Sequence, residues 1–131
     1  DFVETSTRSM SVNSFASFLH PDHFKIFVGL LGKGVDASFI TSAKLLEKIK
    51  ADYYDDLKKL MFTGSVQFYV YKEKMNLVSF SQNDHCFVLR MLTKNNDYDR
   101  KQLVCTGSKA LEWGNELFEY YKQQSIPITD M

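Results

Sequence analysis

Apolar residues recur every three or four positions in the last long stretch of the chain, residues 108–125. This spacing places them on one side of an α-helix, and the stripe consists of Ala110, Trp113, Gly114, Leu117, Phe118 and Tyr121. Glycine costs about 1 kcal/mol relative to alanine inside a helix, so Gly114 indicates that another part of the backbone approaches closely there. The pattern predicts a helix whose aromatic side chains pack against a core, or in part line a pocket.

The same helical spacing occurs in three earlier segments. It predicts a short helix over residues 11–19 and a second helix that begins near Pro21 and ends at Gly32 and Gly34. It also predicts a helix of about five turns from Ser42 to about residue 62, for which the Ser42 hydroxyl can act as the N-terminal cap.

Strand patterns separate these predicted helices. Residues 66–71 alternate between apolar and polar side chains, as a half-buried strand does, and residues 35–41 are rich in β-branched and aromatic side chains. The segments expected to form strands are residues 2–3, 35–41, 66–71, 77–81, 86–92 and 103–105. We expect a polar loop at residues 94–102 and a loose tail at residues 126–131.

The order of these elements predicts an α/β fold. The two opening units are crossovers, which favour parallel pairing, whereas the strands at residues 77–81 and 86–92 follow at hairpin distance and form an antiparallel meander. We therefore expect residues 1–131 to form one domain, a three-layer mixed sheet with helices on both faces.

Composition agrees with a single globular domain. The chain has 131 residues, of which 44% are hydrophobic and 24% charged. A domain of this size buries roughly two thirds of its unfolded surface and needs no disulfide or metal to fold. Cys86 and Cys105 are therefore expected to be unpaired thiols in a reducing cytoplasm.

Charge and hydropathy exclude two kinds of partner for this segment. The 16 basic and 16 acidic residues balance, and no basic cluster dominates one predicted face, so a DNA-binding surface is not expected. The longest apolar run, at residues 26–31, is far shorter than the roughly 20 residues that span a membrane. The chain begins at Asp1 rather than at methionine, which suggests that it belongs to a longer protein, although processing would give the same start.

Hydroxyl groups follow two of the predicted strands. Open α/β sheets bind ligands beyond the carboxyl ends of their parallel strands, beside helix N-termini. The residues at these places are Thr5, Ser6, Thr7, Arg8, Ser9, Thr41 and Ser42, with Cys105 and Trp113 near the start of the last helix as further candidates. They would suit an anionic or polyhydroxyl ligand, although hydroxyl-rich loops also serve as caps and turns.

Other chemistry is weakly indicated. His20 and His23 could begin a metal site, but no further ligands follow at a familiar spacing. His85 directly precedes Cys86, and a histidine beside a cysteine can act as the base that activates its thiol. A cysteine in an alternating strand is more often a core residue. Arg90 faces either solvent or a cleft. No phosphate-binding glycine loop or nucleophile elbow is present, so we expect no catalysis, cofactor or metal.

Residues 97–122, DYDRKQLVCTGSKALEWGNELFEYYK, carry a more specific signal. They resemble the effector domain that follows a winged-helix DNA-binding domain in archaeal regulators of the Fil-type methanogenesis-regulator family. The family pattern A-x-x-W-G-x-x-L-F-x-Y-Y is matched by Ala110, Trp113, Gly114, Leu117, Phe118, Tyr120 and Tyr121. The remainder of the chain is similar in pattern, and Cys105 stands where the family often has serine.

The resemblance implies a cytoplasmic signal-sensing and dimerisation domain of an archaeal transcription regulator. Such a domain forms a homodimer, binds a small polar or anionic effector without catalysis, and reaches DNA only through an N-terminal domain. The resemblance also implies the architecture of half a phospholipase D fold, in which we expect the catalytic H-x-K motif to be missing.

Two alternatives remain open. One is a phospholipase-D-like or other small hydrolase that uses His85, Cys86 or Cys105. The other is a pure dimerisation module without a ligand, with Tyr69 and Tyr71 in the dimer face.

Overall fold

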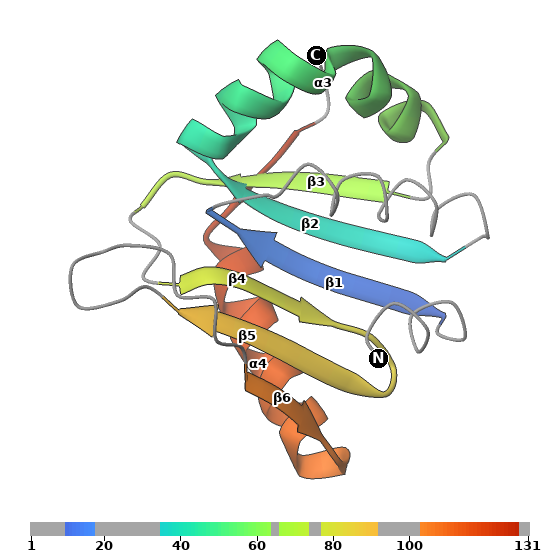
Figure 1. Ribbon diagram of the computed structural model, residues 1–131, viewed down its shortest axis with the longest axis vertical. Coiled ribbons are helices and arrows are strands. Elements are labelled where there is room, and N and C mark those ends of the chain that lie inside the picture. The colour runs from blue at the N-terminus through green and yellow to red at the C-terminus, as the bar shows by residue number, and fades with distance from the viewer. Residues whose placement is uncertain (1–9, 18–34, 64–65, 74–76, 92–102, 129–131) are drawn as a thin grey trace.

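The computed structural model describes residues 10–17, 35–63, 66–73, 77–91 and 103–128. They form a seven-stranded sheet and two helices, shown in Figure 1. In chain order the elements are β1 (Ser11–Ala16), β2 (Asp36–Ser42), α3 (Ala43–Thr63), β3 (Val66–Tyr71), β4 (Leu77–Gln82), β5 (Cys86–Met91), β6 (Leu103–Thr106), α4 (Ser108–Gln123) and β7 (Ile126–Pro127).

The sheet is mixed, as the sequence predicts. Its strand order is β6-β5-β4-β1-β2-β3-β7. β1, β2 and β3 are parallel to one another, while β4, β5 and β6 form an antiparallel meander. The meander does not continue from β3, because β4 pairs with β1 on the opposite side of the parallel strands.

The central strand β1 is where the sequence prediction was wrong. Residues 11–19 were expected to be helical, but Ser11–Ala16 is a strand paired on both sides. Val12, Phe15 and Ala16 are all buried. Since both faces of this strand are covered, its apolar residues do not alternate, and a short apolar run of this kind cannot be distinguished from a helix by periodicity.

Two predicted segments cannot be compared with the structure. The strand at residues 2–3 with its following loop, and the helix that begins near Pro21, lie outside the described residues. The same holds for the polar loop at residues 94–102.

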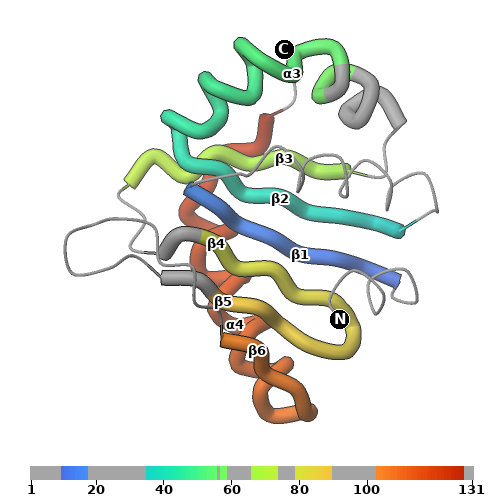
Figure 2. Tube along the Cα trace, viewed as in Figure 1, coloured from blue at the N-terminus to red at the C-terminus, as the bar shows by residue number. Residues whose placement is uncertain are grey.

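Two apolar clusters hold the sheet and helices together. The first combines side chains of β1, β2, β3 and α3, namely Ala16, Ala37, Phe39, Leu45, Ile49, Leu57, Val66 and Phe68. The second combines strands and α4, namely Phe15, Ile40, Tyr71, Phe80, Phe87, Leu89 and Phe118. Successive strand residues point to opposite faces. Ala16 belongs to the first cluster and Phe15 to the second, so the two clusters lie on opposite faces of the sheet. Figure 2 shows α4 passing behind the sheet, whereas α3 lies along the β3 side.

The long helix α3 follows the predicted boundaries closely. It starts directly after β2, and the Ser42 hydroxyl accepts a hydrogen bond from the Leu45 backbone N–H at 3.1 Å. At Tyr53 the backbone leaves helical geometry (φ −133°, ψ 30°), so two helical segments meet at a kink. Among the described residues, no helix combines the length and the apolar character that a membrane span requires.

The end of the chain is more ordered than predicted. β7 pairs with Tyr69 and Val70 of β3, and the Ile128 N–H donates a hydrogen bond to the Phe68 carbonyl at 2.8 Å. The expectation of a loose tail was therefore wrong for residues 126–128. An isolated two-residue strand has almost no signal of its own in a sequence, because its pairing depends on the neighbouring edge.

Candidate functional site

The carboxyl ends of the parallel strands meet at one edge of the sheet. Thr41 lies opposite Ala16 of β1 and Val70 of β3, and α3 begins two residues later. At β1 the connections diverge, since β2 lies on one side of it and β4 on the other. β4 is antiparallel to β1, so its carboxyl end lies at the other edge. The edge that contains Thr41 is a candidate because open α/β sheets bind ligands beyond the carboxyl ends of their parallel strands.

Thr41 has an unusual environment at this edge. Its side chain is fully buried, and within the described part of the chain its hydroxyl oxygen Oγ1 has no hydrogen-bond partner. Thr41 follows Phe39 by two residues, so it faces the side of the sheet that α3 covers. An unpaired buried hydroxyl destabilises a protein by about 1–3 kcal/mol, and such a group calls for an explanation.

Ser42 has a structural contact. Its hydroxyl caps α3 by accepting from the Leu45 N–H. The first turn of α3 contains no acidic residue, and Lys44 is exposed there. The partial positive charge at the start of the helix is therefore not balanced by a carboxylate of its own first turn.

A second hydroxyl contact lies on the same face and was missed from the sequence. Ser14 of β1 is buried, and its hydroxyl lies 3.0 Å from the hydroxyl of Ser81 in β4. Val12, Ser14 and Ala16 are two residues apart, so in a strand they lie on one face. Because this segment was predicted to be a helix, Ser14 was not recognised as part of that face.

Cys105 and Trp113 lie elsewhere. Cys105 is half-buried in β6 and packs against the second cluster. The ring of Trp113 lies 5.4 Å from that of Phe87 and is 49% exposed. Three strands separate β2 from β6, so the structure does not bring these two residues together with Thr41 and Ser42. Thr5, Ser6, Thr7, Arg8 and Ser9 lie outside the described residues.

The close approach predicted at Gly114 is present, but a side chain makes it rather than a backbone. Gln82 of β4 is buried beneath α4, and its Nε2 donates hydrogen bonds to the Leu111 carbonyl and to Asn115 Oδ1, each at 3.0 Å. A Cβ atom at Gly114 would overlap the Gln82 amide oxygen and lie 3.3 Å from Cζ of Phe80. Glycine is therefore what allows Gln82 to fix α4 on the sheet.

Asn83 holds the turn between β4 and β5, which contains His85 and leads into Cys86. The Asn83 side-chain oxygen accepts hydrogen bonds from the backbone N–H groups of His85 at 2.8 Å and Cys86 at 2.9 Å. Cys86 is buried, as expected for a core residue. In the described part of the chain, no group of three or more His, Cys, Asp and Glu residues could hold a metal ion.

Three candidates cannot be placed. His20, His23 and the side chain of Arg90 lie outside the described part of the structure. The expectation that the H-x-K motif is missing was wrong at the level of the sequence itself, because His23-Phe24-Lys25 has that spacing.

Tyr71 of β3 and Tyr121 of α4 pack against each other in the second cluster. Tyr71 is buried, and its ring meets that of Tyr121 edge-on at 5.0 Å. Burial is the main cause that raises the pKa of both phenols above the usual value. Because Tyr71 is buried, it is not available for the dimer face of the pure-dimerisation alternative.

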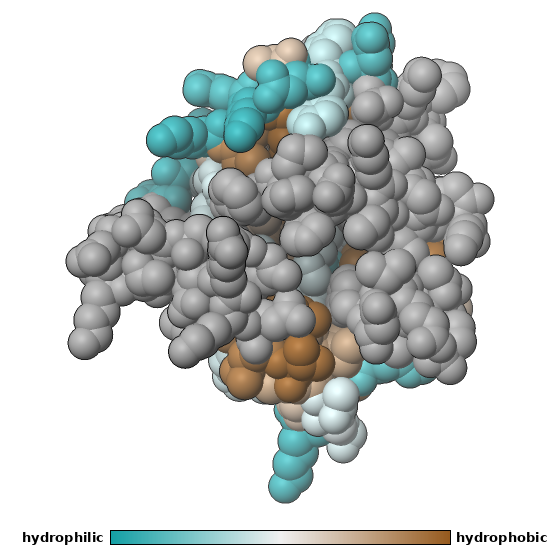
Figure 3. Space-filling view, in the orientation of Figure 1, coloured by the Kyte–Doolittle hydropathy of each residue, from teal (hydrophilic) through white to brown (hydrophobic). Residues whose placement is uncertain are grey.

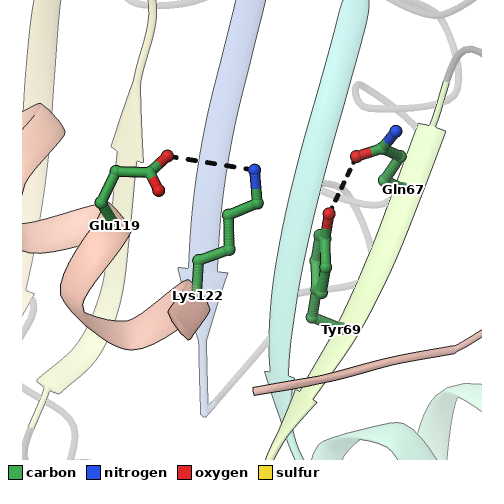
Figure 4. Close-up of polar contacts among 4 residues, drawn as sticks. All are labelled: Gln67, Tyr69, Glu119 and Lys122. Atoms are coloured by element: carbon green, nitrogen blue, oxygen red, sulfur yellow. Dashed lines mark hydrogen bonds and ion pairs between the residues drawn. The ribbon is translucent and has the colours of Figure 1, made fainter. Parts of the chain in front are cut away.

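Tyr69 is also engaged within the chain. Its hydroxyl donates to Gln67 Oε1 at 2.8 Å, and Lys122 Nζ lies 5.6 Å from the ring centroid. Figure 4 shows Lys122 with Glu119, whose carboxylate is 3.9 Å away. Only the contact between Lys122 and the Tyr69 ring joins α4 to β3, and surface contacts of these kinds contribute little individually.

The chain matches one protein family and is similar to several solved structures. The family "Methanogenesis regulatory protein FilR1, middle domain" matches residues 1–124. Among solved structures, TrmBL2, described as an archaeal chromatin protein with a novel mode of DNA binding, superposes with a TM-score of 0.74 and 14% identity. That alignment covers 97% of this chain and 49% of TrmBL2, so the chain spans about half the length of that relative.

Two structures of another class share the fold. Nuc, a phospholipase D family member from Salmonella typhimurium, has a TM-score of 0.63 at 15% identity, covering 98% of this chain and 90% of Nuc. Phosphatidylserine synthase from Haemophilus influenzae Rd KW20 has a TM-score of 0.68 at 10% identity, covering 98% of this chain and 36% of the synthase. These likenesses show the fold and the half-phospholipase-D architecture. The comparison with curated proteins gave no match.

Proposed function

Since the chain belongs to the family of the middle domain of the methanogenesis regulatory protein FilR1, we propose that it is the signal-sensing and dimerisation part of an archaeal helix-turn-helix transcription regulator. In this proposal it binds a small polar or anionic effector without catalysis. Binding shifts the pairing of two subunits and so the spacing of DNA-reading helices in another domain. The protein would act in the cytoplasm.

The observation that carries the sensing role is the unpaired Thr41 hydroxyl beside the start of α3. We assign Thr41 and Ser42 to one side of the effector site, and Thr5, Ser6, Thr7, Arg8 and Ser9 to the other. Cys105 and Trp113, which lie at the β6 side of the sheet, are assigned to the subunit interface instead.

Thermal denaturation with a panel of small anions and metabolites tests the sensing role. A ligand that binds only the folded state stabilises it by about 2.7 kcal/mol at a hundredfold excess over Kd. We expect Tm to rise with the concentration of at least one compound. Absence of a shift with every compound would remove the sensor role and leave a pure dimerisation module.

Support for dimerisation comes from the β6 edge of the sheet. Leu103 and Val104 are 56% and 53% exposed, and Trp113 is half-exposed nearby on α4. Figure 3 shows apolar surface in this region, over β5 and β6. An open apolar edge strand without charged residues is suited to antiparallel pairing with its own copy. The opposite edge ends in Pro127, which has no N–H to donate.

Sedimentation velocity tests this interface. The unmodified chain should sediment as a dimer and Val104→Lys as a monomer, because a charge on an edge strand opposes pairing. Ile126→Lys provides the matched control, since Ile126 is 47% exposed at the opposite edge, and it should stay dimeric. Loss of the dimer in both variants, or a monomeric parent chain, would contradict the assignment.

One alternative function has a specific observation in its favour. The phospholipase D-like fold occurs together with the His23-Phe24-Lys25 sequence. A phosphodiester substrate assay separates the two functions. We expect no turnover, and an activity that disappears in His23→Ala and Lys25→Ala would establish the hydrolase instead.

A further inference from the structure

The start of α3 is electrostatically unusual. α3 has 21 residues, and its N-terminus lies at the carboxyl edge of the parallel strands. Backbone N–H groups and partial positive charge at such a terminus attract anions. Natural helices commonly place Asp or Glu in this turn, but α3 has no acidic residue there and carries Lys44 instead.

A second lysine extends the positive charge along the same side of the helix. Lys44 and Lys48 are four residues apart, so their side chains are neighbours, and both are exposed. Within the part of the chain that the structure describes, neither forms an ion pair with a carboxylate. Two like charges at this spacing, next to the positive end of a helix, disfavour the helix, and the exposed Glu47, three residues after Lys44, offsets them in part.

Thr41 supplies an independent indication of a ligand. Its hydroxyl is buried, has no partner among the described residues, and lies on the face of the sheet that α3 covers. Thr41 precedes the first residue of the helix by only two positions. A bound acceptor at the helix start would give this hydroxyl the hydrogen bond that it lacks.

From these observations we propose that the first turn of α3 is an oxyanion site, in which the helix N-terminus, the Lys44 ammonium and the Thr41 hydroxyl bind a phosphate or carboxylate group. The inference rests on the proposed sensing function and specifies the chemistry of its effector. Lys48 adds attraction at longer range.

Thermal denaturation with inorganic phosphate and with acetate, each against chloride at equal ionic strength, tests the site. We expect one of the two oxyanions to raise Tm of the unmodified chain. Thr41→Val and Lys44→Ala should each weaken the apparent affinity by about tenfold, the usual effect of losing one hydrogen bond to a charged group.

Three control measurements show whether a weaker anion response comes from loss of the site rather than from general loss of stability or of positive charge. Without anion, Thr41→Val should be at least as stable as the parent chain, because valine removes an unpaired hydroxyl. Thr41→Ser should retain the anion response. Lys50→Ala alters an exposed lysine of the same helix outside its first turn and should respond like the parent chain.

The outcomes separate this inference from the proposed function. An equal rise of Tm in the parent chain, Thr41→Val and Lys44→Ala would show general stabilisation by the salt and would overturn the site. No response to either oxyanion, with a response to an uncharged metabolite, would also overturn it while the sensing role stands. No response to any compound would remove both.

Discussion

Replacement of Gly114 by alanine is the sharpest test of how α4 is held on the sheet. The added methyl group would overlap the Gln82 amide oxygen, lie 3.0 Å from Gln82 Cδ, and lie 3.3 Å from Cζ of Phe80. Gln82 cannot retreat without leaving its hydrogen bonds to the Leu111 carbonyl and Asn115 Oδ1. The substitution therefore sets the helix preference of alanine against packing and hydrogen bonding.

The sizes of these opposing effects decide whether Gly114→Ala raises or lowers the free energy of unfolding. Alanine favours the helix by about 1 kcal/mol. Overpacking a core costs about 1–3 kcal/mol, and two lost hydrogen bonds cost about 0.5–1.5 kcal/mol each. We expect Gly114→Ala to lower the free energy of unfolding by about 2–3 kcal/mol, which for a chain of this size lowers Tm on the order of 10 °C.

Urea and thermal denaturation followed by circular dichroism would measure this effect. Glu116→Ala, at an exposed position of the same helix, is the control and should change stability little. In a Gln82→Ala background the methyl group has room, so Gly114→Ala should be far less costly there. A Gly114→Ala variant that is more stable than the parent chain would refute the reasoning.

Three further predictions concern local contacts. Ser42→Ala should lower the free energy of unfolding by about 1 kcal/mol through loss of the α3 cap, and Ser42→Asp should restore it; equal stability of all three chains would deny the cap. Burial, followed by the neighbouring Tyr120 and Glu73, raises the pKa of Tyr71 above 10.0. The folded state thus keeps a proton that the unfolded state releases, and stability should fall as pH rises above 10 through the folded pKa. Tyr71→Phe should flatten this alkaline limb in urea titrations at several pH values, and an unchanged slope would contradict the pKa shift. Asn83→Ala should cost about 1–3 kcal/mol in urea unfolding, because the N–H groups of His85 and Cys86 lose their acceptor; a neutral effect would show that water replaces it.

The elements with a one-sided apolar pattern were predictable from the sequence. α4 carries its stripe on one side, and Val66 and Phe68 alternate with Gln67 and Tyr69 along β3. In both cases one face meets a cluster while the other is more open, so the periodicity survives in the sequence. The parallel pairing of β2 with β3 follows from the crossover through α3.

Features set by tertiary contacts were not predictable. β1 is covered on both faces, which removes the alternation that identifies a strand. Once β1 is misassigned as a helix, the sheet loses its centre, and β4 has no partner other than β3. Gly114 was correctly read as a close approach, but the identity of Gln82 as the neighbour depends on strand register, which no local pattern encodes.

The candidate site was predictable in part. The edge rule for α/β sheets selects the junction of β2 and α3, and the structure places Thr41 and Ser42 at that junction. It could not reveal that Cys105 and Trp113 lie across the sheet, because that separation follows from the strand order. The hydrogen-bonding state of Thr41 likewise depends on packing rather than on sequence.

The proposal most in need of a test is that this domain binds an effector and releases it unchanged. Its most direct test is to incubate the chain with each compound that raises Tm, and then to identify the recovered compound by mass spectrometry. We expect a concentration-dependent rise of Tm with the compound recovered intact. Recovery of a hydrolysed product, or the absence of any compound that raises Tm, would contradict it.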